Sequence, residues 1–533
     1  MSRRTGLLLA AIVIVGLGAR VGYLLHATSQ PRYSWDDPDH YSVKADKLAN
    51  GSTGWRWSFD VVRHSSYDHR VYMLPPGYPV FLSLFASFPG YPFSAQMGQA
   101  LLSTVTILML FLLGREIHST RAGLVAAGIY ALWLPNIIAV WSTMQESLYI
   151  PLVTMALALL LRGAREESRA WVLGTAGLVF GIATLTRSMP LYAMPLFAFV
   201  LLLRPTVARR KRLVGIATLA TGFLAATLPY SVLLSAHLSR PTFVENHGSI
   251  FIIERYGGLE GDDPATLPET VGILTRAFYE DPLGRTLDLW TTTKSVLHVN
   301  GGRLLQIYLG ASTRLGAAAS RVATLAFADG SFVLCLLAAP FGLFLCRRRD
   351  LAMFLVVWVL VTLGLTALSF GGPRLRAPIE PSLIALAAVF FAGGFRAPGW
   401  RGLACALGIS LVSASVVLPQ LPRSARARAD YGVHWPMTNP PKRSRMVGDA
   451  GFNLMARDDA LRFHVRTRNP AGVTLVEVRI DGVEVERMRL GDQEHRFELP
   501  AGGFPIVHVE LSAVDASTNE PVPLLVIVPG RAS

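Results

Sequence analysis

Long apolar runs separated by short polar turns dominate most of the chain. A helix that spans a bilayer needs roughly 20 mostly apolar residues, because no water is present there to satisfy its backbone hydrogen bonds. The runs predict about eleven spans, over residues 6–26, 95–114, 122–141, 147–161, 171–186, 189–203, 213–236, 327–346, 351–370, 377–394 and 402–419. The run 76–89 is shorter, and we expect it to dip into the membrane surface without crossing.

The basic residues of the turns predict an orientation. They are Arg3, Arg4, Arg115, Arg121, Arg162, Arg165, Arg169, Arg204, Arg209, Arg210, Lys211, Arg212, Arg347, Arg348, Arg349, Arg396 and Arg401. With about eleven spans all of these turns fall on one side, which the positive-inside rule makes cytoplasmic. The opposite side then receives the loops 27–75 and 237–326 and everything after residue 419. We therefore expect a multi-pass protein of the cell inner (cytoplasmic) membrane, with residues 1–419 as its all-α membrane domain.

The C-terminal tail follows a different pattern. Segments between residues 459 and 533 alternate apolar and polar residues at period two and are separated by turns such as Asp481-Gly482, which predicts a soluble antiparallel β-sandwich. Residues 420–458, rich in Pro and Arg, form a linker, and we expect the sandwich on the non-cytoplasmic side. Arginines alternate along the strands, and they form either a basic face suited to anionic glycan or a plain solvated face: Arg462, Arg466, Arg468, Arg479, Arg487 and Arg489.

Composition narrows the function classes. The chain is 51% hydrophobic and 16% charged, which is too apolar for a soluble protein of 533 residues. Its net charge of +14 lies in the turns and not in a basic stripe, so we predict no nucleic-acid partner. The three cysteines lie within spans, so no disulfide framework is expected. The histidines lack the close spacing of metal ligands, and we predict neither a metal nor a cofactor.

Three carboxylates, Asp36, Asp37 and Asp39, follow the first span directly. Apolar residues recur at helical spacing over residues 39–49 and predict a short helix lying on the membrane. Asp37 or Asp39 is suited to cap such a helix, which would account for the acids without any chemistry. The second interpretation is a catalytic base held among other carboxylates.

Five motifs together resemble the GT-C superfamily of membrane glycosyltransferases, in the branch of the protein O-mannosyltransferases and the lipid A aminoarabinose transferases. They are Asp37 four residues before Tyr41, Pro75-Pro76-Gly77-Tyr78-Pro79, Glu146 before a span, Leu185-Thr186-Arg187 followed by Pro190, and Arg374-Leu375-Arg376-Ala377-Pro378, where Leu375 replaces the family's usual Tyr. The resemblance covers roughly residues 5–400 and leaves out the tail.

The resemblance implies a GT-C-like fold and an inverting transfer of a sugar from a polyprenyl-phosphate donor to an acceptor hydroxyl on the non-cytoplasmic face. It implies Asp37 as the base, with Asp36 and Asp39 as competitors. A polyprenyl phosphate is already a good leaving group, so no second carboxylic acid is needed to protonate the leaving oxygen. Cations can stabilise the negative charge of the departing phosphate instead. The candidates for that role are Arg374, Arg376, Arg187, Arg63 and Lys294, and those for substrate binding are Tyr41, Tyr78, Glu146 and His247. The acceptor is a glycan, a lipid or a protein.

Two other function classes stay open. One is a polytopic polysaccharide ligase, polymerase or flippase, and the other is a receptor or assembly protein that displays a β-sandwich. The acidic loop directly after the first span favours the transferase, since a ligase or polymerase usually places its large loop late in the chain. A transporter keeps polar residues within its spans, and these spans read as nearly free of ionisable residues. A span-end arginine such as Arg187 or Arg376 also has a simpler interpretation, which is snorkelling to the headgroups.

Overall fold

The computed structural model describes two compact units. The helical unit falls within residues 1–28, 37–299 and 327–421, and a second unit contains residues 422–533. The described residues are 2–28, 41–50, 63–65, 71–165, 169–205, 207–239, 241–243, 256, 267–297, 329–369, 373–393, 400–418 and eight strands between 444 and 527. The predicted acids Asp36, Asp37 and Asp39 and the predicted substrate contact His247 lie outside these residues.

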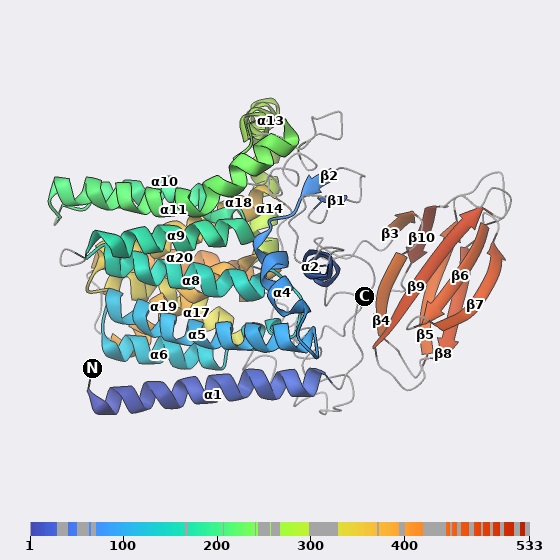
Figure 1. Ribbon diagram of the computed structural model, residues 1–533, viewed down its shortest axis with the longest axis horizontal. Coiled ribbons are helices and arrows are strands. Elements are labelled where there is room, and N and C mark those ends of the chain that lie inside the picture. The colour runs from blue at the N-terminus through green and yellow to red at the C-terminus, as the bar shows by residue number, and fades with distance from the viewer. Residues whose placement is uncertain are drawn as a thin grey trace. The chain divides into compact units, whose positions relative to one another are not determined.

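The helical unit is a bundle of roughly parallel and antiparallel helices (Figure 1). Its elements are α1 (Arg3–Ala27), α2 (Tyr41–Ala49), β1 (Arg63–Ser65), β2 (Val71–Met73), α4 (Gly77–Ala86), α5 (Phe93–Ile117), α6 (Thr120–Ala131), α7 (Leu134–Ala139), α8 (Glu146–Gly163), α9 (Ala170–Thr186), α10 (Met189–Leu202), α11 (Arg209–Leu238), α13 (Leu267–Glu280), α14 (Pro282–Val296), α17 (Gly330–Leu345), α18 (Arg349–Leu368), η3 (Pro373–Ile379), α19 (Glu380–Gly393) and α20 (Trp400–Val417). Every apolar run expected to span the membrane coincides with a helix or, at 122–141, with the broken pair α6–α7.

Seven of the described helices are long and apolar enough to cross a membrane: α1, α5, α8, α11, α18, α19 together with the end of η3, and α20. The helices α4, α9, α10 and α17 are apolar but shorter, so the count of about eleven spans stays a prediction. In the most apolar stretches of α8 and α19, 78% of the residues are buried, against 22% in α20. The helices α8 and α19 are therefore central, and α20 is peripheral.

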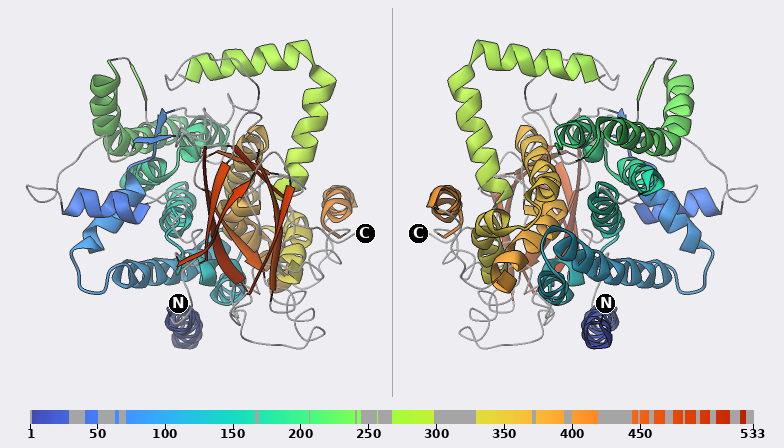
Figure 2. Two further views of the ribbon diagram at one scale, coloured as in Figure 1. Left: turned by 90° about the vertical axis from the view of Figure 1, so that its right-hand side faces the viewer. Right: turned by 90° about the vertical axis from the view of Figure 1, so that its left-hand side faces the viewer.

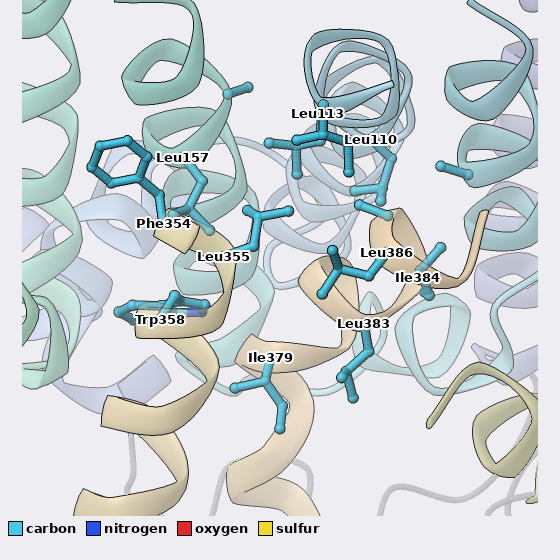
Figure 3. Packing of buried hydrophobic residues seen from close by; sticks show 14 of the residues in the cluster. Leu110, Leu113, Leu157, Phe354, Leu355, Trp358, Ile379, Leu383, Ile384 and Leu386 are labelled. Atoms are coloured by element: carbon cyan, nitrogen blue, oxygen red, sulfur yellow. The ribbon is translucent and has the colours of Figure 1, made fainter. Parts of the chain in front are cut away.

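The core of the unit lies between α5, α8, α18 and α19. Figure 3 shows Leu110, Leu157, Phe354 and Leu383 converging from these four helices. The Trp358 indole Nε1 donates to the Pro378 carbonyl at 2.9 Å, which joins α18 to η3. Lipid is as apolar as these side chains, so close packing stabilises the bundle more than removal from water does. The helices α9 and α11 show how close that packing is, because a Cβ at Gly177 or Gly222 would collide with the backbone of the other helix.

A buried arginine in α1 is one of the few ionisable residues within the predicted spans. The guanidinium of Arg20 donates to Ser103 Oγ at 2.7 Å and to the Ala131 and Tyr130 carbonyls at 3.0 and 3.3 Å. Those two carbonyls end α6, where the chain breaks before α7, and the Tyr130 carbonyl also accepts from the Trp133 N–H at 3.1 Å. Arg20 therefore satisfies a helix end inside the bundle and fastens α1 to α5 and α6. A charge inside a span of 25 residues is compatible with lipid because all of it is buried.

The basic turns gather at one end of the bundle. Glu116 accepts hydrogen bonds from Arg115, Arg162 and Arg165 at 3.3, 3.2 and 3.1 Å. The Nε of Arg204 donates to Asp350 Oδ2 at 2.9 Å. Turns that are far apart in sequence thus meet, as the orientation argument requires. The assignment of this end to the cytoplasm stays a prediction.

The chain turns at Glu280-Asp281-Pro282 between two helices. The helix α13 ends at Glu280 and α14 begins at Pro282, and the two meet at a corner (Figure 2). Asp281 Oδ1 accepts from the Gly284 N–H at 2.9 Å, which caps the start of α14. Because α14 packs on α18 and η3, it reaches the end of the bundle opposite the basic turns.

The second unit contains the strands expected of the tail. They are β3 (Ser444–Val447), β4 (Ala450–Met455), β5 (Ala460–Thr467), β6 (Thr474–Ile480), β7 (Val483–Leu490), β8 (Glu494–Pro500), β9 (Ile506–Asp515) and β10 (Pro523–Ile527). They form two four-stranded sheets, in the orders β3-β10-β5-β8 and β4-β9-β6-β7, with antiparallel pairs throughout. The first two strands begin within the stretch predicted to be a linker, and the packing of the two sheets as a sandwich stays a prediction.

The strand register bears on the predicted basic face. Glu498 stands opposite Arg462, and Glu494 stands opposite Arg466. In the other sheet Glu477 stands opposite Arg487. Opposite charges in directly facing positions stabilise a sheet and cancel much of its field. The register therefore favours the plain solvated face over a basic surface for anionic glycan.

The first residue of α4 leads to a stability prediction. A Cβ at Gly77 would lie 2.7 Å from Thr186 Oγ1 and 2.9 Å from the Leu185 carbonyl, both at the end of α9. Gly77→Ala should therefore push α4 away from α9 and cost about 1–3 kcal/mol of unfolding free energy. The thermal midpoint of the purified protein measures this. Gly18→Ala is the matched control, since a Cβ there meets nothing within 4 Å, and an equal midpoint for the two variants would contradict the prediction.

Candidate functional site

An aromatic pair joins the short helices α2 and α4. The rings of Tyr41 and Tyr78 meet edge to face, with their centroids 5.0 Å apart, and both side chains are buried. The Tyr78 hydroxyl donates to Gln99 Oε1 at 2.6 Å, and Gln99 Nε2 donates to the Val140 carbonyl at 3.0 Å. The two tyrosines predicted to bind substrate therefore contact each other. They are tied to α5 and to the loop that leads into α8.

The second cluster is a buried ion pair between α8 and the end of α9. The Arg187 Nη1 donates to Glu146 Oε1 at 2.9 Å, and the two residues are 9% and 4% exposed. The sequence places them there because α9 ends at Thr186, and Arg187 already has an extended backbone with φ −159° and ψ 129°. Burial in an ion pair replaces snorkelling as the description of Arg187.

The third cluster surrounds Arg376 in η3. Its Nε donates to Glu380 Oε1 at 3.1 Å, and its guanidinium lies 3.8 Å from the centroid of the Phe332 ring. The other oxygen of Glu380 accepts from the Trp133 indole Nε1 at 2.6 Å. Arg376 and Glu380 are 4% and 2% exposed, so this arginine does not snorkel either.

Sequence reasoning missed Glu380 and Trp133. One signal was available for Glu380, which follows Arg376 by four residues at the start of an apolar run. An acid and a base four apart on a helix are neighbours. For Trp133 there was no such signal, because it lies 247 residues from Glu380.

The three clusters lie at the same end of the bundle. Gln99 is near the start of α5, Glu146 starts α8, Arg187 follows α9 and Arg376 precedes α19. Since η3 contacts α8 and α14, the two ion pairs belong to neighbouring elements. This end is opposite the basic turns, and in Figure 1 it carries α2 and α4. It is the end expected to face the non-cytoplasmic side.

The structure gives less detail for the other residues that the sequence predicted as phosphate ligands. Lys294 is exposed on α14, with its Nζ 5.1 Å from the centroid of the Trp290 ring. Arg63 lies in β1 and Arg374 in η3, and for both only the backbone is described. Within the described part of the chain, no three His, Cys, Asp or Glu side chains are grouped to hold a metal ion.

The two ion pairs are suited to bind an anion. A guanidinium carries five N–H donors in a planar fork that matches the oxygens of a phosphate. Glu146 accepts from Nη1 of Arg187, and Glu380 accepts from Nε of Arg376, so each guanidinium is held in place by one of its nitrogens. The carboxylate partner also neutralises each buried cation.

Comparison with known proteins supports the resemblance drawn from the motifs. Residues 74–232 match the family model described as dolichyl-phosphate-mannose-protein mannosyltransferase. This stretch contains Tyr78, Glu146 and Arg187, and it leaves out Asp37 and Arg376. The expected resemblance to glycosyltransferases is confirmed over that stretch. No curated protein matches the chain by sequence.

Solved structures similar to the chain include the following two. One is the archaeal oligosaccharyltransferase AglB from Archaeoglobus fulgidus, in complex with an inhibitory peptide and a dolichol-phosphate. It is 16% identical with a TM-score of 0.43, over 80% of this chain and 56% of that one. The other is ArnT from Cupriavidus metallidurans bound to undecaprenyl phosphate, 15% identical with a TM-score of 0.44, over 81% of this chain and 67% of that one. The chain thus spans little more than half of the archaeal enzyme.

Proposed function

We propose that the protein is a membrane glycosyltransferase. It transfers a sugar from a polyprenyl-phosphate donor to an acceptor hydroxyl on the non-cytoplasmic face, with inversion at the anomeric carbon. The observation that carries this proposal is the pair of buried arginines, Arg187 and Arg376, each held by a glutamate at the same end of the bundle. The family match over residues 74–232 adds the reaction class.

The chemistry assigned to the site needs one base and a cationic leaving-group site. Asp37 takes the proton of the acceptor hydroxyl as its oxygen attacks the anomeric carbon, with Asp36 and Asp39 as the competing candidates for this base. The bond from that carbon to the phosphate oxygen breaks at the same time, and negative charge grows on the polyprenyl phosphate. Arg187 and Arg376 stabilise this charge with preorganised N–H donors, and Arg374, Arg63 and Lys294 are further candidates.

The architecture in the membrane is part of the same proposal. Residues 1–419 form the membrane domain with its outer loops 27–75 and 237–326, and residues 459–533 form a β-sandwich after the linker 420–458. The tail and the site both face the non-cytoplasmic side of the cytoplasmic membrane. A donor carried by a lipid suits that side, where nucleotide sugars are not supplied. In this proposal the helices α13 and α14 of the second loop cover the donor, which the packing of α14 on η3 supports.

The experiment that tests the proposal is transfer of radiolabel from polyprenyl-phosphate sugars. Membranes containing the protein are given a panel of undecaprenyl-phosphate-linked hexoses and pentoses, with whole envelope extract as the acceptor. We expect one donor to label a glycan, lipid or protein fraction, and membranes without the protein give the background. No transfer from any donor, beside a transferase known to be active, would favour a ligase, a flippase or a receptor instead.

A further inference from the structure

Three buried polar atoms around the start of α8 have no hydrogen-bond partner among the described residues. They are Gln96 Oε1 on α5, Gln145 Oε1 at the N-cap of α8 and the Tyr149 hydroxyl one turn later. The three residues are 5%, 4% and 0% exposed, so their polar atoms do not form hydrogen bonds with bulk water in this conformation. Buried polar groups in folded proteins are almost always paired, so three orphans in one place call for an explanation.

The three residues belong to one locality. The other end of the Gln96 amide, Nε2, donates to the Trp141 carbonyl at 2.5 Å, which holds Gln96 against the loop that runs from α7 into α8. Gln145 closes that loop, and Tyr149 follows it by four residues, so both lie on one face of α8. Glu146, between them in sequence, binds Arg187. The first turn of α8 therefore carries the orphan atoms of Gln145 and Tyr149 together with the carboxylate that holds one of the two candidate phosphate-binding arginines.

The chemistry of these atoms differs from that of the arginine. Two are amide oxygens, which only accept hydrogen bonds, and the third is a phenol hydroxyl, which donates and accepts. Amide oxygens repel a phosphate but suit a ligand that presents several O–H donors close together. A sugar ring is such a ligand. In a polyprenyl-phosphate sugar the ring is joined directly to the phosphate, so neighbouring sites for the two are what the donor requires.

We propose that Gln96, Gln145 and Tyr149 form a subsite for the sugar ring of the donor, next to the phosphate bound by Arg187. This inference rests on the proposed function and adds the recognition of the sugar to it. Among the described residues the three atoms have no partner, and an unpaired buried polar atom costs stability. The hydroxyl groups of the bound ring pair with them, and that cost is recovered as affinity for the sugar-bearing lipid over the bare one.

The proposal predicts opposite effects on stability and on binding. Tyr149→Phe and Gln145→Met remove an orphan polar atom and keep most of the side-chain volume. In the full-length protein without ligand each should leave the thermal midpoint unchanged or raise it, because an unpaired buried group is lost. Each should also weaken binding of the sugar-bearing lipid by about 3–10-fold, the effect of one neutral hydrogen bond.

The measurement uses two kinds of lipid. Dissociation constants are determined in nanodiscs for undecaprenyl phosphate and for undecaprenyl-phosphate-linked glucose, mannose, galactose and arabinose. We expect the parent to prefer one sugar-bearing lipid, and Tyr149→Phe to reduce that preference by about 3–10-fold while its affinity for bare undecaprenyl phosphate stays the same. Tyr130→Phe is the matched control: Tyr130 is buried at the end of α6, its hydroxyl is not among the unpaired buried atoms, and the loss of that hydroxyl should lower the midpoint without changing the preference.

The other outcomes separate the two proposals. A parent that binds undecaprenyl phosphate but gains nothing from any sugar would overturn the subsite and leave the phosphate site standing. Equal weakening of both lipids in Tyr149→Phe, or a midpoint lowered as in Tyr130→Phe, would give Tyr149 a structural role and overturn the subsite. A parent that binds neither lipid would overturn the proposed function together with the subsite.

Discussion

Asp37→Asn should lower the rate of sugar transfer by about 10³-fold, within the range that general base catalysis supplies. Asparagine has nearly the same shape as aspartate but cannot take up the proton of the acceptor hydroxyl. The substitution also leaves a cap for a following helix, so α2 (Tyr41–Ala49) should form as before. Initial rates with saturating donor, per amount of folded protein, measure the effect.

The neighbouring acids provide the controls for this prediction. Asp36→Asn and Asp39→Asn change the same charge within two residues of Asp37 and should each leave most of the activity. A loss that falls on one of these two variants instead would move the base to that residue and leave the reaction class intact. Full activity in all three variants would leave the acids as helix caps and would contradict a carboxylate base in this loop.

Arg376→Lys should lower the transfer rate by about 10²-fold or more, although the positive charge is kept. Removing one preorganised donor from a developing negative charge typically costs that much. Arginine has a planar guanidinium, whereas lysine has a single flexible ammonium. Arg376 binds Glu380 through its Nε and keeps its other N–H donors directed away from that nitrogen, and one ammonium group cannot bind Glu380 in this way and a phosphate as well. It also loses the stacking of the guanidinium on Phe332, at 3.8 Å. The rate and the affinity for undecaprenyl phosphate are both measured, and both should fall.

An ion pair at the other end of the bundle provides the matched control. Asp350→Asn breaks the pair with the largely buried Arg204 and should lower the thermal midpoint, while the rate per folded molecule stays the same. Glu380→Gln leaves the buried Arg376 without its counter-ion, which typically costs about 3–5 kcal/mol of stability, and it should lower the rate as well. If Arg376→Lys loses stability but keeps its rate, Arg376 has only a structural role.

The sequence alone located the helices and the order of the motifs. Hydropathy is a property of consecutive residues, and a bilayer imposes a fixed length on an apolar helix, so each predicted run coincides with a helix or, at 122–141, with the broken pair α6–α7. The period-two alternation of the tail likewise predicted strands that the structure contains. The motifs around Tyr78, Glu146 and Arg187 indicated a glycosyltransferase, and the family match covers all three.

Tertiary structure decided which residues meet, since partners inside a bundle are chosen by packing and not by sequence distance. Arg187 and Arg376 read as span-end arginines, yet each is buried with a glutamate, one of them 41 residues away. The alternating arginines of the tail read as a basic face, until the strand register set glutamates opposite Arg462 and Arg466. The structural role of Arg20 could not be predicted from the sequence. The two carbonyls to which it donates lie 110 and 111 residues further along the chain, at the end of a helix. A charge or a polar atom can be buried only where its partners are brought to it, and only the folded bundle determines those partners.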